Sequence, residues 1–323
     1  MENKKQAAYI GVDLGATNIK FGLVLPDGKI ILERKSQTKV HRGVDYVFDQ
    51  IAENARALFD FAGGIYEIKG FGIGVPGLID TSNKKVVEAA NFPGWNDIKI
   101  GRELEKRLQL NISIDNDANL AALGEYAFGA GRGVTEMMMV TLGSGVGGGL
   151  ILNGRIYHGS AGAAGEFGHI TIQKDGPLCA CGRRGCVEAF VGKYAIVRRM
   201  QEILEKETGS ILKNQSAENL TPEDIFKAAE KGDGPAIRLF KEVGESLGVG
   251  LGNVANLLNL ERVVIGGGVA NAGELLMEHT RKILSEIALK TNGESIDIVQ
   301  AELGERAGIV GAAELAKIES ENC

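Results

Sequence analysis

The chain carries VDLGATNIKFGLVLPDGKII at residues 12–31 and repeats the same pattern as VTLGSGVGGGLILNGRIY at residues 140–157. Each segment is typical of a strand, a Leu-Gly pair with small residues, a second strand, an Asx-Gly turn and a third strand. One large mixed sheet with accidental similarity is the alternative interpretation. We favour a duplicated α/β fold with two lobes, and a duplicated fold of this kind commonly places its ligand site between the halves.

The predicted elements around these segments follow the same order in both halves of the chain. Apolar residues at helical spacing predict a helix over 44–59, and a second helix is expected near 101–109. In the second half we expect strands at 263–265 and 296–300, with helices at about 187–206, 222–231, 235–246, 249–258 and 273–288. The expected lobes are a small N-terminal lobe, 1–117, joined by a C-terminal helix at 305–323, and a large lobe, 118–304.

Composition narrows the possible functions. The chain has 323 residues, which suits two domains, and its 44% hydrophobic and 24% charged residues are ordinary for a globular protein. A net charge of −6 without a basic stripe argues against nucleic acid as a partner. The apolar runs are too short to span a membrane, and the N-terminus lacks the pattern of a signal peptide. We therefore expect a cytoplasmic enzyme.

Glycine-rich turns predict a site for a phosphate-bearing ligand. The first turn provides small residues and side-chain donors after a strand, and Asp13 ends that strand where a hydrated Mg²⁺ could bind. A tight hairpin with no ligand is the alternative for each turn alone. The predicted nucleotide-binding residues are Asp13, Gly15, Ala16, Thr17, Asn18, Thr141, Gly143, Ser144, Gly145, Gly266, Gly267 and Gly268. None of the turns matches the P-loop pattern or a clean dinucleotide-binding pattern.

Three cysteines within eight residues predict a metal centre. The segment CACGRRGC provides Cys179, Cys181 and Cys186, and His169 lies ten residues before the first of them. One histidine and three cysteines form a closed tetrahedral ligand set, which is the pattern of structural zinc. Buried apolar cysteines and disulfides are the alternatives, but the loop is rich in Gly and Arg, and nothing indicates secretion. The fourth cysteine, Cys323, receives no role.

The chain resembles the ROK family of repressors, uncharacterised frames and sugar kinases. The resemblance covers nearly the whole chain in the family's order and rests on DLGATN, GIGVPGLID, NFPGW, NDANLAALGE, TLGSGVGGGLI, GEFGH, CACGRRGCVE and IGGGVANAG. One departure is Ala16, where the family often has Gly, and a methyl group there should be tolerated. The resemblance implies a duplicated actin-like ATPase fold, related to ribonuclease H, with a cleft between the lobes. It is strongest to the family's bacterial ATP-dependent glucokinases.

The resemblance also implies roles for individual residues. Asp117 matches the family's catalytic base, although an aspartate before an Ala/Leu-rich helix is also a common N-cap. Carboxylates and amides can read sugar hydroxyl groups as paired hydrogen bonds. The implied sugar contacts are Asn91, Asn116, Asp117, Glu166, His169 and Glu188. His169 would use one ring nitrogen for zinc and the other for the sugar.

The expected reaction is transfer of the ATP γ-phosphate to the 6-hydroxyl of glucose, with Mg²⁺ bridging the phosphates and a structural Zn²⁺ in the cysteine loop. Another hexose, such as mannose or N-acetylmannosamine, and polyphosphate as the donor remain alternatives, as does a sugar-sensing relative that does not bind DNA. A sugar-responsive repressor of the family would carry a DNA-binding domain before the first strand. Because the first strand is expected near residue 7, the sequence favours a kinase over a repressor. A homodimer or homotetramer is the expected assembly.

Overall fold

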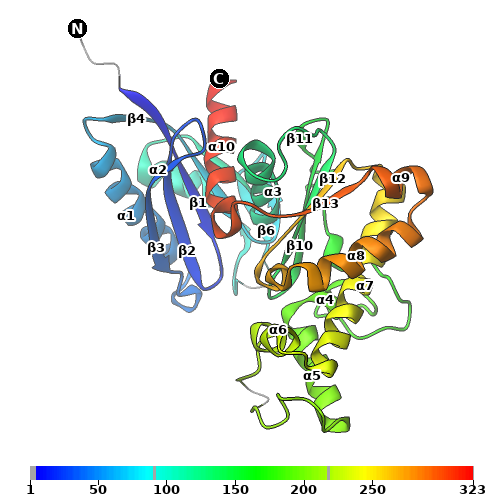
Figure 1. The fold of residues 1–323 in the computed structure, drawn as a ribbon. Helices are drawn as coiled ribbons and strands as arrows, with labels where there is room; N and C mark the ends of the chain where they lie inside the picture. The colour runs from blue at the N-terminus through cyan, green and yellow to red at the C-terminus, as the bar shows by residue number, and fades with distance from the viewer. Residues whose placement is uncertain (1–4, 90–91, 217–218, 323) are drawn as a thin grey trace. The chain divides into compact units, whose positions relative to one another are not determined.

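The computed structural model describes residues 5–89, 92–216 and 219–322 (Figure 1). The chain forms two compact units. The first consists of Met1–Thr135, Gly149–Gly165 and Glu302–Cys323, and the second consists of Glu136–Gly148 and Glu166–Ala301. The lobes expected from the sequence, 1–117 with 305–323 and 118–304, stay a prediction, and the compact units divide the chain at other residues.

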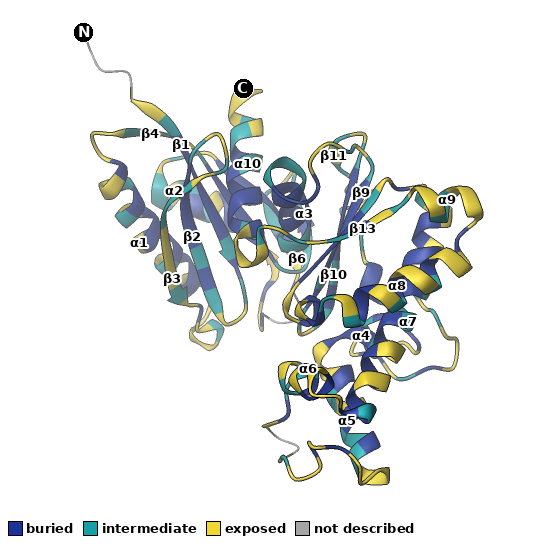
Figure 2. Cartoon of the chain, viewed as in Figure 1, coloured by how far each residue is buried: buried dark blue, intermediate teal, exposed yellow. Residues whose placement is uncertain are grey.

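A five-stranded sheet of order β3-β2-β1-β4-β8 organises the first unit. Its strands are β1 (Gln6–Leu14), β2 (Asn18–Val24), β3 (Ile30–Gln37), β4 (Tyr66–Val75) and β8 (Ile112–Asn116). The first three strands are antiparallel, whereas β1, β4 and β8 run parallel. The edge strand β3 is largely exposed along its length (Figure 2). The parallel strands therefore bring the ends of β1, β4 and β8 to one edge of the sheet.

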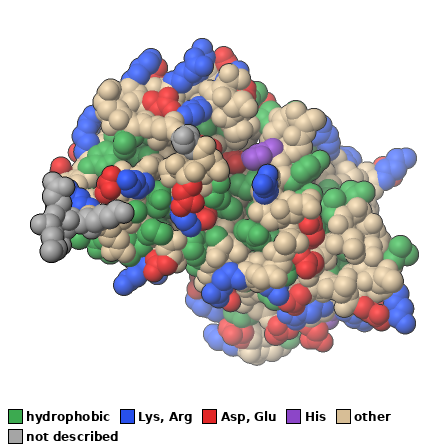
Figure 3. All heavy atoms as spheres, turned by 90° about the horizontal axis from the view of Figure 1, so that it is seen from above, with side chains coloured by type: hydrophobic (Ala, Val, Ile, Leu, Met, Phe, Trp, Pro, Cys, Tyr) green, Lys and Arg blue, Asp and Glu red, His purple; other side chains and the backbone are tan. Residues whose placement is uncertain are grey.

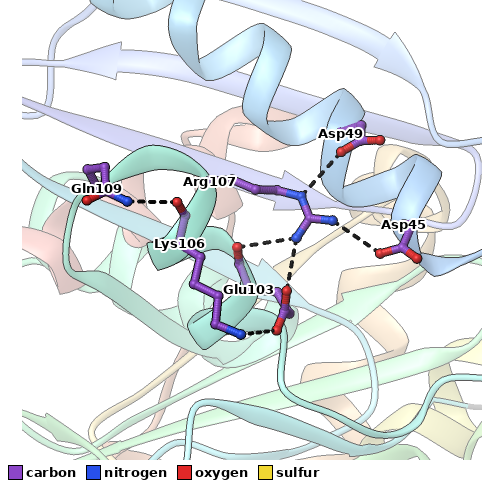
Figure 4. Close-up of polar contacts among 6 residues, drawn as sticks. All are labelled: Asp45, Asp49, Glu103, Lys106, Arg107 and Gln109. Atoms are coloured by element: carbon purple, nitrogen blue, oxygen red, sulfur yellow. Dashed lines mark hydrogen bonds and ion pairs between the residues drawn. The ribbon is translucent and has the colours of Figure 1, made fainter.

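Two helices follow the strands of the first unit, α1 (Val44–Ala62) and α2 (Ile100–Leu108). The predicted apolar face of α1 is confirmed, because Val47, Ile51 and Leu58 are completely buried. Arg107 of α2 joins the two helices through its guanidinium group (Figure 4). It donates to Asp49 at 3.2 Å, Asp45 at 3.1 Å and Glu103 at 3.1 Å. These contacts tie the exposed ends of α1 and α2 together.

The C-terminal helix α10 (Ala307–Glu321) packs against β1, β4 and α3 (Asp117–Phe128) at unusually short range (Figure 1). Glycine makes this possible. A Cβ atom on Gly72 of β4 would lie 2.7 Å from the carbonyl carbon of Ala312, and one on Gly11 of β1 would lie 2.9 Å from that of Ile309. A Cβ on Gly311 of α10 would lie 2.6 Å from the carbonyl carbon of Leu120 in α3. Backbone therefore packs directly on backbone at three places.

A second five-stranded sheet has the order β11-β10-β9-β12-β13. Its strands are β9 (Met137–Leu142), β10 (Val146–Leu152), β11 (Arg155–Ile156), β12 (Arg262–Gly266) and β13 (Asp297–Gln300). Strands β9, β12 and β13 are parallel, and β10 pairs antiparallel with β11. The two sheets therefore have equivalent strand orders. In each, the three strands of the repeated segment lie in reverse chain order, and two later strands follow that run parallel to the first of them. This equivalence confirms the duplication predicted from the sequence.

The longest helix of the second unit is α7 (Gly234–Leu258), which the sequence predicted as two shorter helices. The prediction was wrong because glycine weakens a helix locally, and α7 contains Gly244, Gly248 and Gly252. These glycines face α8 (Glu274–Ile287). A Cβ atom on them would lie 2.7 Å from Leu276 O, Thr280 O and Ile287 Cβ, respectively. Close packing on α8 therefore compensates for the weak helix propensity.

Four further helices lie in the described residues of the second unit. They are α4 (Glu188–Val191), α5 (Lys193–Lys206), α6 (Pro222–Glu230) and α9 (Lys290–Ser295). The single helix predicted at 187–206 is divided at Gly192, which is extended with φ −69° and ψ 153°. Short 3₁₀ turns lie at η1 (Val40–Arg42), η2 (Phe167–His169), η4 (Gly268–Ala272) and η5 (Gly304–Arg306).

A three-stranded sheet in the first unit was not predicted. It consists of β5 (Leu78–Asp80), β6 (Lys85–Glu88) and β7 (Asn96–Ile98), in that order. These strands are only three or four residues long and carry many polar residues, so their period-two pattern is too short to detect. A turn closed by Asp80, which accepts from the Asn83 backbone at 3.0 Å and side chain at 2.8 Å, precedes β6.

Acidic and basic side chains are interspersed on the face drawn in Figure 3. Within the described part of the chain, none of the helices combines the length and the apolar character that crossing a membrane requires.

Candidate active site

The first glycine turn joins β1 to β2 and is held in shape by its own backbone and by Thr38. Gly15 N–H donates to Asn18 O at 3.0 Å. The Thr38 hydroxyl donates to Gly15 O at 2.6 Å, and Thr38 N–H donates to Thr17 O at 3.0 Å. Three carbonyl oxygens that would repel an anion, those of Gly15, Thr17 and Asn18, therefore already accept hydrogen bonds. Ala16 and Thr17 remain exposed at the tip.

Asp13 lies beside this turn at the end of β1 and packs against Gly308 of α10, where an added Cβ would lie 3.1 Å from the carboxyl carbon. Burial raises the pKa of Asp13, Lys20 lowers it, and Glu305 raises it further. The Lys20 ammonium is 4.0 Å from Asp13 but only 3.2 Å from Glu305. Lys20 is thus shared between two carboxylates. Such a carboxylate suits a cation that supplies more positive charge.

The second glycine turn, in the second unit, is built on the same plan. Gly143 N–H donates to Gly145 O at 2.9 Å, and Gly143 O accepts from Lys193 N–H at 3.0 Å. Glu188 accepts from Val146 N–H at 3.0 Å, and a Cβ atom on Gly145 would lie 2.5 Å from the same carboxylate. A larger residue at 145 would therefore displace the Glu188 carboxylate. Ser144 is exposed at the tip of the turn.

The third glycine turn lies next to the second. Gly266 pairs with Thr141 in the register of β12 and β9. Gly267 has φ +89°, and a Cβ atom there would lie 2.7 Å from the backbone nitrogen of Leu142. Gly268 opens into free space, since nothing lies within 4 Å of its ideal Cβ. The strand pairing therefore brings Thr141, Gly143–Gly145 and Gly266–Gly268 to one edge of the sheet.

Asp117 begins helix α3, directly after β8. The N-cap is Asn116 rather than Asp117. The Asn116 side-chain oxygen accepts from Ala118 N–H at 2.9 Å and Asn119 N–H at 3.2 Å, and its amide donates to Gly77 O at 3.0 Å. The capping alternative considered for Asp117 thus belongs mainly to its neighbour, although Asp117 also accepts from Ala118 N–H at 2.9 Å.

The four predicted metal ligands come together in the second unit. The ligand atoms of His169, Cys179, Cys181 and Cys186 all lie within 4.8 Å of one another. Cys181 Sγ is 3.7 Å from Cys186 Sγ, and Cys179 Sγ is 3.8 Å from His169 Nδ1. A tetrahedral site with metal–sulfur bonds of about 2.3 Å has edges of roughly 3.8 Å. The donor atoms therefore fit a tetrahedral metal ion.

The thiols differ in how readily they lose a proton. Burial raises the pKa of Cys179 to about 12. Backbone N–H donation from Arg183 is the main factor that lowers the pKa of Cys181 to about 7. Burial also raises the pKa of Cys186. Thiolates are the form that binds metal, so a cation at this position would replace the protons that the buried thiols otherwise retain.

His169 presents its two ring nitrogens to different neighbours. Nδ1 faces Cys179, whereas Nε2 is 3.9 Å from the Glu166 carboxylate. Glu188 lies on the other side of the cysteine loop and accepts from Cys179 Sγ at 3.3 Å. A metal on Nδ1 would require hydrogen on Nε2, because a neutral ring carries one hydrogen. His169 Nε2 would then be a hydrogen-bond donor beside the Glu166 carboxylate, which is an acceptor.

The predicted site residues fall into two groups. Asp13, Gly15–Asn18, Asn116 and Asp117 belong to the first unit. The second and third glycine turns, Glu166 and the cysteine loop with Glu188 belong to the second. Asn91 lies outside the described residues, as does Cys323.

Two buried carboxylates, one at the end of β8 and one in α3, were missed by sequence reasoning. Asp115 is 2% exposed and accepts from His158 Nε2 at 2.6 Å. Glu125 is completely buried and accepts backbone N–H groups of Ala130 at 2.9 Å, Glu302 at 3.1 Å and Leu303 at 2.8 Å. Their partners lie 43 to 178 residues away or in an irregular turn. No local pattern in the sequence could have indicated these contacts.

Comparison with known proteins identifies the class and then the family. A crystal structure of a glucokinase from Streptomyces griseus, in complex with glucose and AMPPNP, matches with a TM-score of 0.81 and 34% identity over 96% of this chain and 99% of that one. The chain accordingly has the duplicated actin-like ATPase fold of sugar kinases. Residues 9–319 match the model of the ROK family, and the chain belongs to that family.

Relatives within the family include kinases and repressors. A glucokinase from Thermotoga maritima is 37% identical over 310 residues, which cover 95% of this chain and 96% of the relative. A xylose repressor from Caldicellulosiruptor bescii is 30% identical over 314 residues, which cover 96% of this chain but 78% of the repressor. The kinase relative therefore matches along nearly its entire length.

Proposed function

We propose that this protein is an ATP-dependent glucokinase, which transfers the γ-phosphate of ATP to the 6-hydroxyl group of glucose. The observation that carries the proposal is the match, over nearly the whole of both chains, to relatives named glucokinase, one of them crystallised with glucose and an ATP analogue. The arrangement of polar groups at the end of β8, at the three glycine turns and at the cysteine loop is consistent with it.

Asp117 is the proposed general base. Phosphoryl transfer requires the acceptor hydroxyl to be aligned with the γ-phosphate and its proton to be accepted as the new bond forms. Asp117 stands at the N-terminus of α3, after the edge strand β8, whose neighbour β4 runs parallel to it and pairs in parallel with β1 on its other side. The Asn116 cap orders the backbone of this turn, which supports a defined orientation for the Asp117 carboxylate.

The sugar contacts proposed in the second unit are Glu166, His169 and Glu188. Glu166 and His169 Nε2, 3.9 Å apart, form an acceptor and a donor that suit a hydroxyl group, since a hydroxyl both donates and accepts. Asn91 and Asn116 are the proposed contacts from the first unit. Asn116 already uses its amide oxygen twice, so its contribution to the sugar would come from the amide nitrogen.

The glycine turns are the proposed ATP site. Gly15–Asn18 and Gly143–Gly145 would bind the phosphates, while Gly266–Gly268, open above Gly268, would accommodate the nucleoside. Mg²⁺ would supply positive charge to the phosphates when bound, and Asp13 would hold it through water. Burial is the main cause of the raised pKa of Asp13, and the positive charge of Lys20 does not offset it, which supports this role.

The proposed metal of the cysteine loop is a structural Zn²⁺. Three thiols and an imidazole fill a tetrahedral set and leave no position for substrate. The loop would hold His169 and Glu188 in place for the sugar. We place the protein in the cytoplasm, where ATP is available, and propose a homodimer or homotetramer, which light scattering of the purified protein would test.

The test of function is a coupled assay with ATP against glucose, mannose, fructose, N-acetylmannosamine and N-acetylglucosamine. Glucose should give the highest kcat/KM. Asp117→Asn should lower kcat at least about 100-fold, because the amide cannot accept the proton. Asp60→Asn, an exposed aspartate on α1, serves as the matched control. A variant that retains more than about a tenth of wild-type turnover, a loss below roughly 1.4 kcal/mol, would show that Asp117 is not the base.

A further inference from the structure

A histidine that has no assigned role contacts the turn that carries the proposed base. His158 follows β11, and its Nε2 atom lies 2.6 Å from Asp115 Oδ2. His158 is about one third exposed, with 35% of its side chain accessible, whereas the Asp115 side chain is 2% exposed. A hydrogen bond this short to a buried carboxylate is of the strong, charge-assisted kind. The bond to Asp115 also raises the pKa of His158, so positive charge on the ring is favoured.

The other oxygen of Asp115 organises the start of α3. Asp115 Oδ1 accepts from Asn116 N–H at 2.7 Å and from the Asn119 side-chain amide at 3.0 Å. One carboxylate thus bonds the residue before Asp117 and a residue in the first turn after it. Leaving this buried carboxylate without its histidine would remove the charge that stabilises it, and a buried unpaired charge is costly.

His158 also closes the loop that leads to Glu166. Ala164 N–H donates to His158 O at 3.1 Å. Gly162, with φ +76°, packs so that an added Cβ would lie 2.7 Å from Ile79 O. The backbone of this loop is therefore held by these contacts, and the His158 ring is held by its bond to Asp115. The histidine joins the loop to the β8–α3 turn by a single side-chain bond.

We propose that His158 is a positioning residue for the phosphoryl-transfer step. It holds the Asp115 carboxylate, which in turn aligns Asn116 and Asn119 so that Asp117 faces the acceptor hydroxyl. His158 acts through Asp115 and does not contact the substrate. This role rests on the proposed function of Asp117, but its structural part, the ordering of the α3 N-terminus, holds whether or not the protein phosphorylates glucose.

Two variants separate positioning from simple loss of structure. His158→Ala removes the donor. His158→Gln retains one, because the glutamine amide nitrogen lies the same number of bonds from the backbone as Nε2. His41→Gln, at an exposed position in η1, is the matched control. Each full-length variant is compared with the wild type by steady-state kinetics and by hydrogen exchange of the Ala118 and Asn119 amides, which the Asn116 cap protects.

We expect His158→Ala to lower kcat roughly ten- to hundredfold, the size of effect produced by small misplacements of catalytic groups, and to leave the KM for ATP within about twofold. The Ala118 and Asn119 amides should exchange at least about tenfold faster, and amides in α1 should not change. His158→Gln should recover most of kcat and the exchange protection.

Three results would overturn the proposal. The first is unchanged exchange at Ala118 and Asn119 in His158→Ala, whatever happens to activity. The second is equal damage in His158→Ala and His158→Gln. The third is a rise in the KM for glucose with kcat unchanged, which would indicate direct contact with the sugar. A wild-type protein inactive on every sugar would contradict the proposed function, and the exchange data would still decide the structural role of His158.

Discussion

Replacing Gly311 by alanine provides a sharp test of the packing that holds α3 in place. Local propensity favours alanine over glycine inside a helix by about 1 kcal/mol, so α10 considered alone should become more stable. The tertiary structure predicts the opposite. A Cβ atom at 311 would lie 2.6 Å from Leu120 C and 2.9 Å from Gly124 N, both backbone atoms of α3. Ordinary contact begins near 3.4 Å.

The magnitude follows from what must move. Relieving the 2.6 Å contact alone requires α3 and α10 to separate by about 0.8 Å, the Leu120 carbonyl oxygen lies closer still, and no flexible side chain can yield instead. Separation would also disturb the buried residues of α10, which include Ile309, Val310 and Ala313. Overpacking of this kind costs 1–3 kcal/mol, and we expect a loss of about 3 kcal/mol because only backbone can adjust. For a unit of this size, that corresponds to a fall in Tm of roughly 6–12 °C.

The assay uses the protein's single tryptophan. Trp95 lies in the first unit with 1% of its surface exposed, so its fluorescence reports unfolding of the unit that contains α3 and α10. Gly64→Ala is the matched control, since nothing lies within 4 Å of its ideal Cβ and its φ is not positive. The control should shift Tm by about 2 °C or less. If Gly311→Ala melts at the same temperature as Gly64→Ala or higher, the close packing of α10 on α3 is refuted.

Three further predictions concern the metal, an ion-pair network and pH. Metal analysis after dialysis should find one zinc ion per chain. Cys181→Ser should lose both the zinc and the activity, whereas the control Cys323→Ser should retain both. Full activity in a metal-free protein would contradict a structural zinc. Arg107→Gln should lower the free energy of unfolding by about 1 kcal/mol in low salt and by less in high salt, because the partners Asp45 and Asp49 are largely exposed and salt screens their charges. A loss of stability that does not depend on salt would argue against ion pairing. Asp115 raises the pKa of His158 in the folded protein above 6.5, so the wild type should be more stable than His158→Gln below about pH 6.5, and this difference in stability should disappear as pH rises through the folded-state pKa. Denaturant titrations at several pH values would measure the difference. A difference that grows with pH would contradict the prediction.

Two features of the protein could be predicted from local sequence patterns. The helix at 44–59 was predicted because its apolar face repeats within a few residues, and the same face is buried in α1. The cysteine loop was predicted because three thiols and a histidine lie within eighteen residues, and their donor atoms do converge. In both cases the decisive information lies within one short stretch of chain.

Other features depended on contacts between distant segments. Helix α7 continues through Gly244 and Gly248 because α8 packs on them, and the propensity of either residue favours a break. The cap of α3 lies on Asn116, although the pattern allowed Asp117, because the amide of Asn116 also reaches Gly77 O. A cap of this kind is settled by a partner 39 residues away.

By itself, the sequence determined the repeated strand–turn–strand units, the family and the four residues whose donor atoms converge in the cysteine loop, because each depends on residue types at short spacing. Only the tertiary structure decided that Asp115 is buried against His158, that Glu125 binds the returning backbone at Glu302 and Leu303, and that glycines place α10 directly on α3. The physical reason is that a carboxylate is stable inside a protein only where donors converge on it, and those donors come from segments brought together by folding.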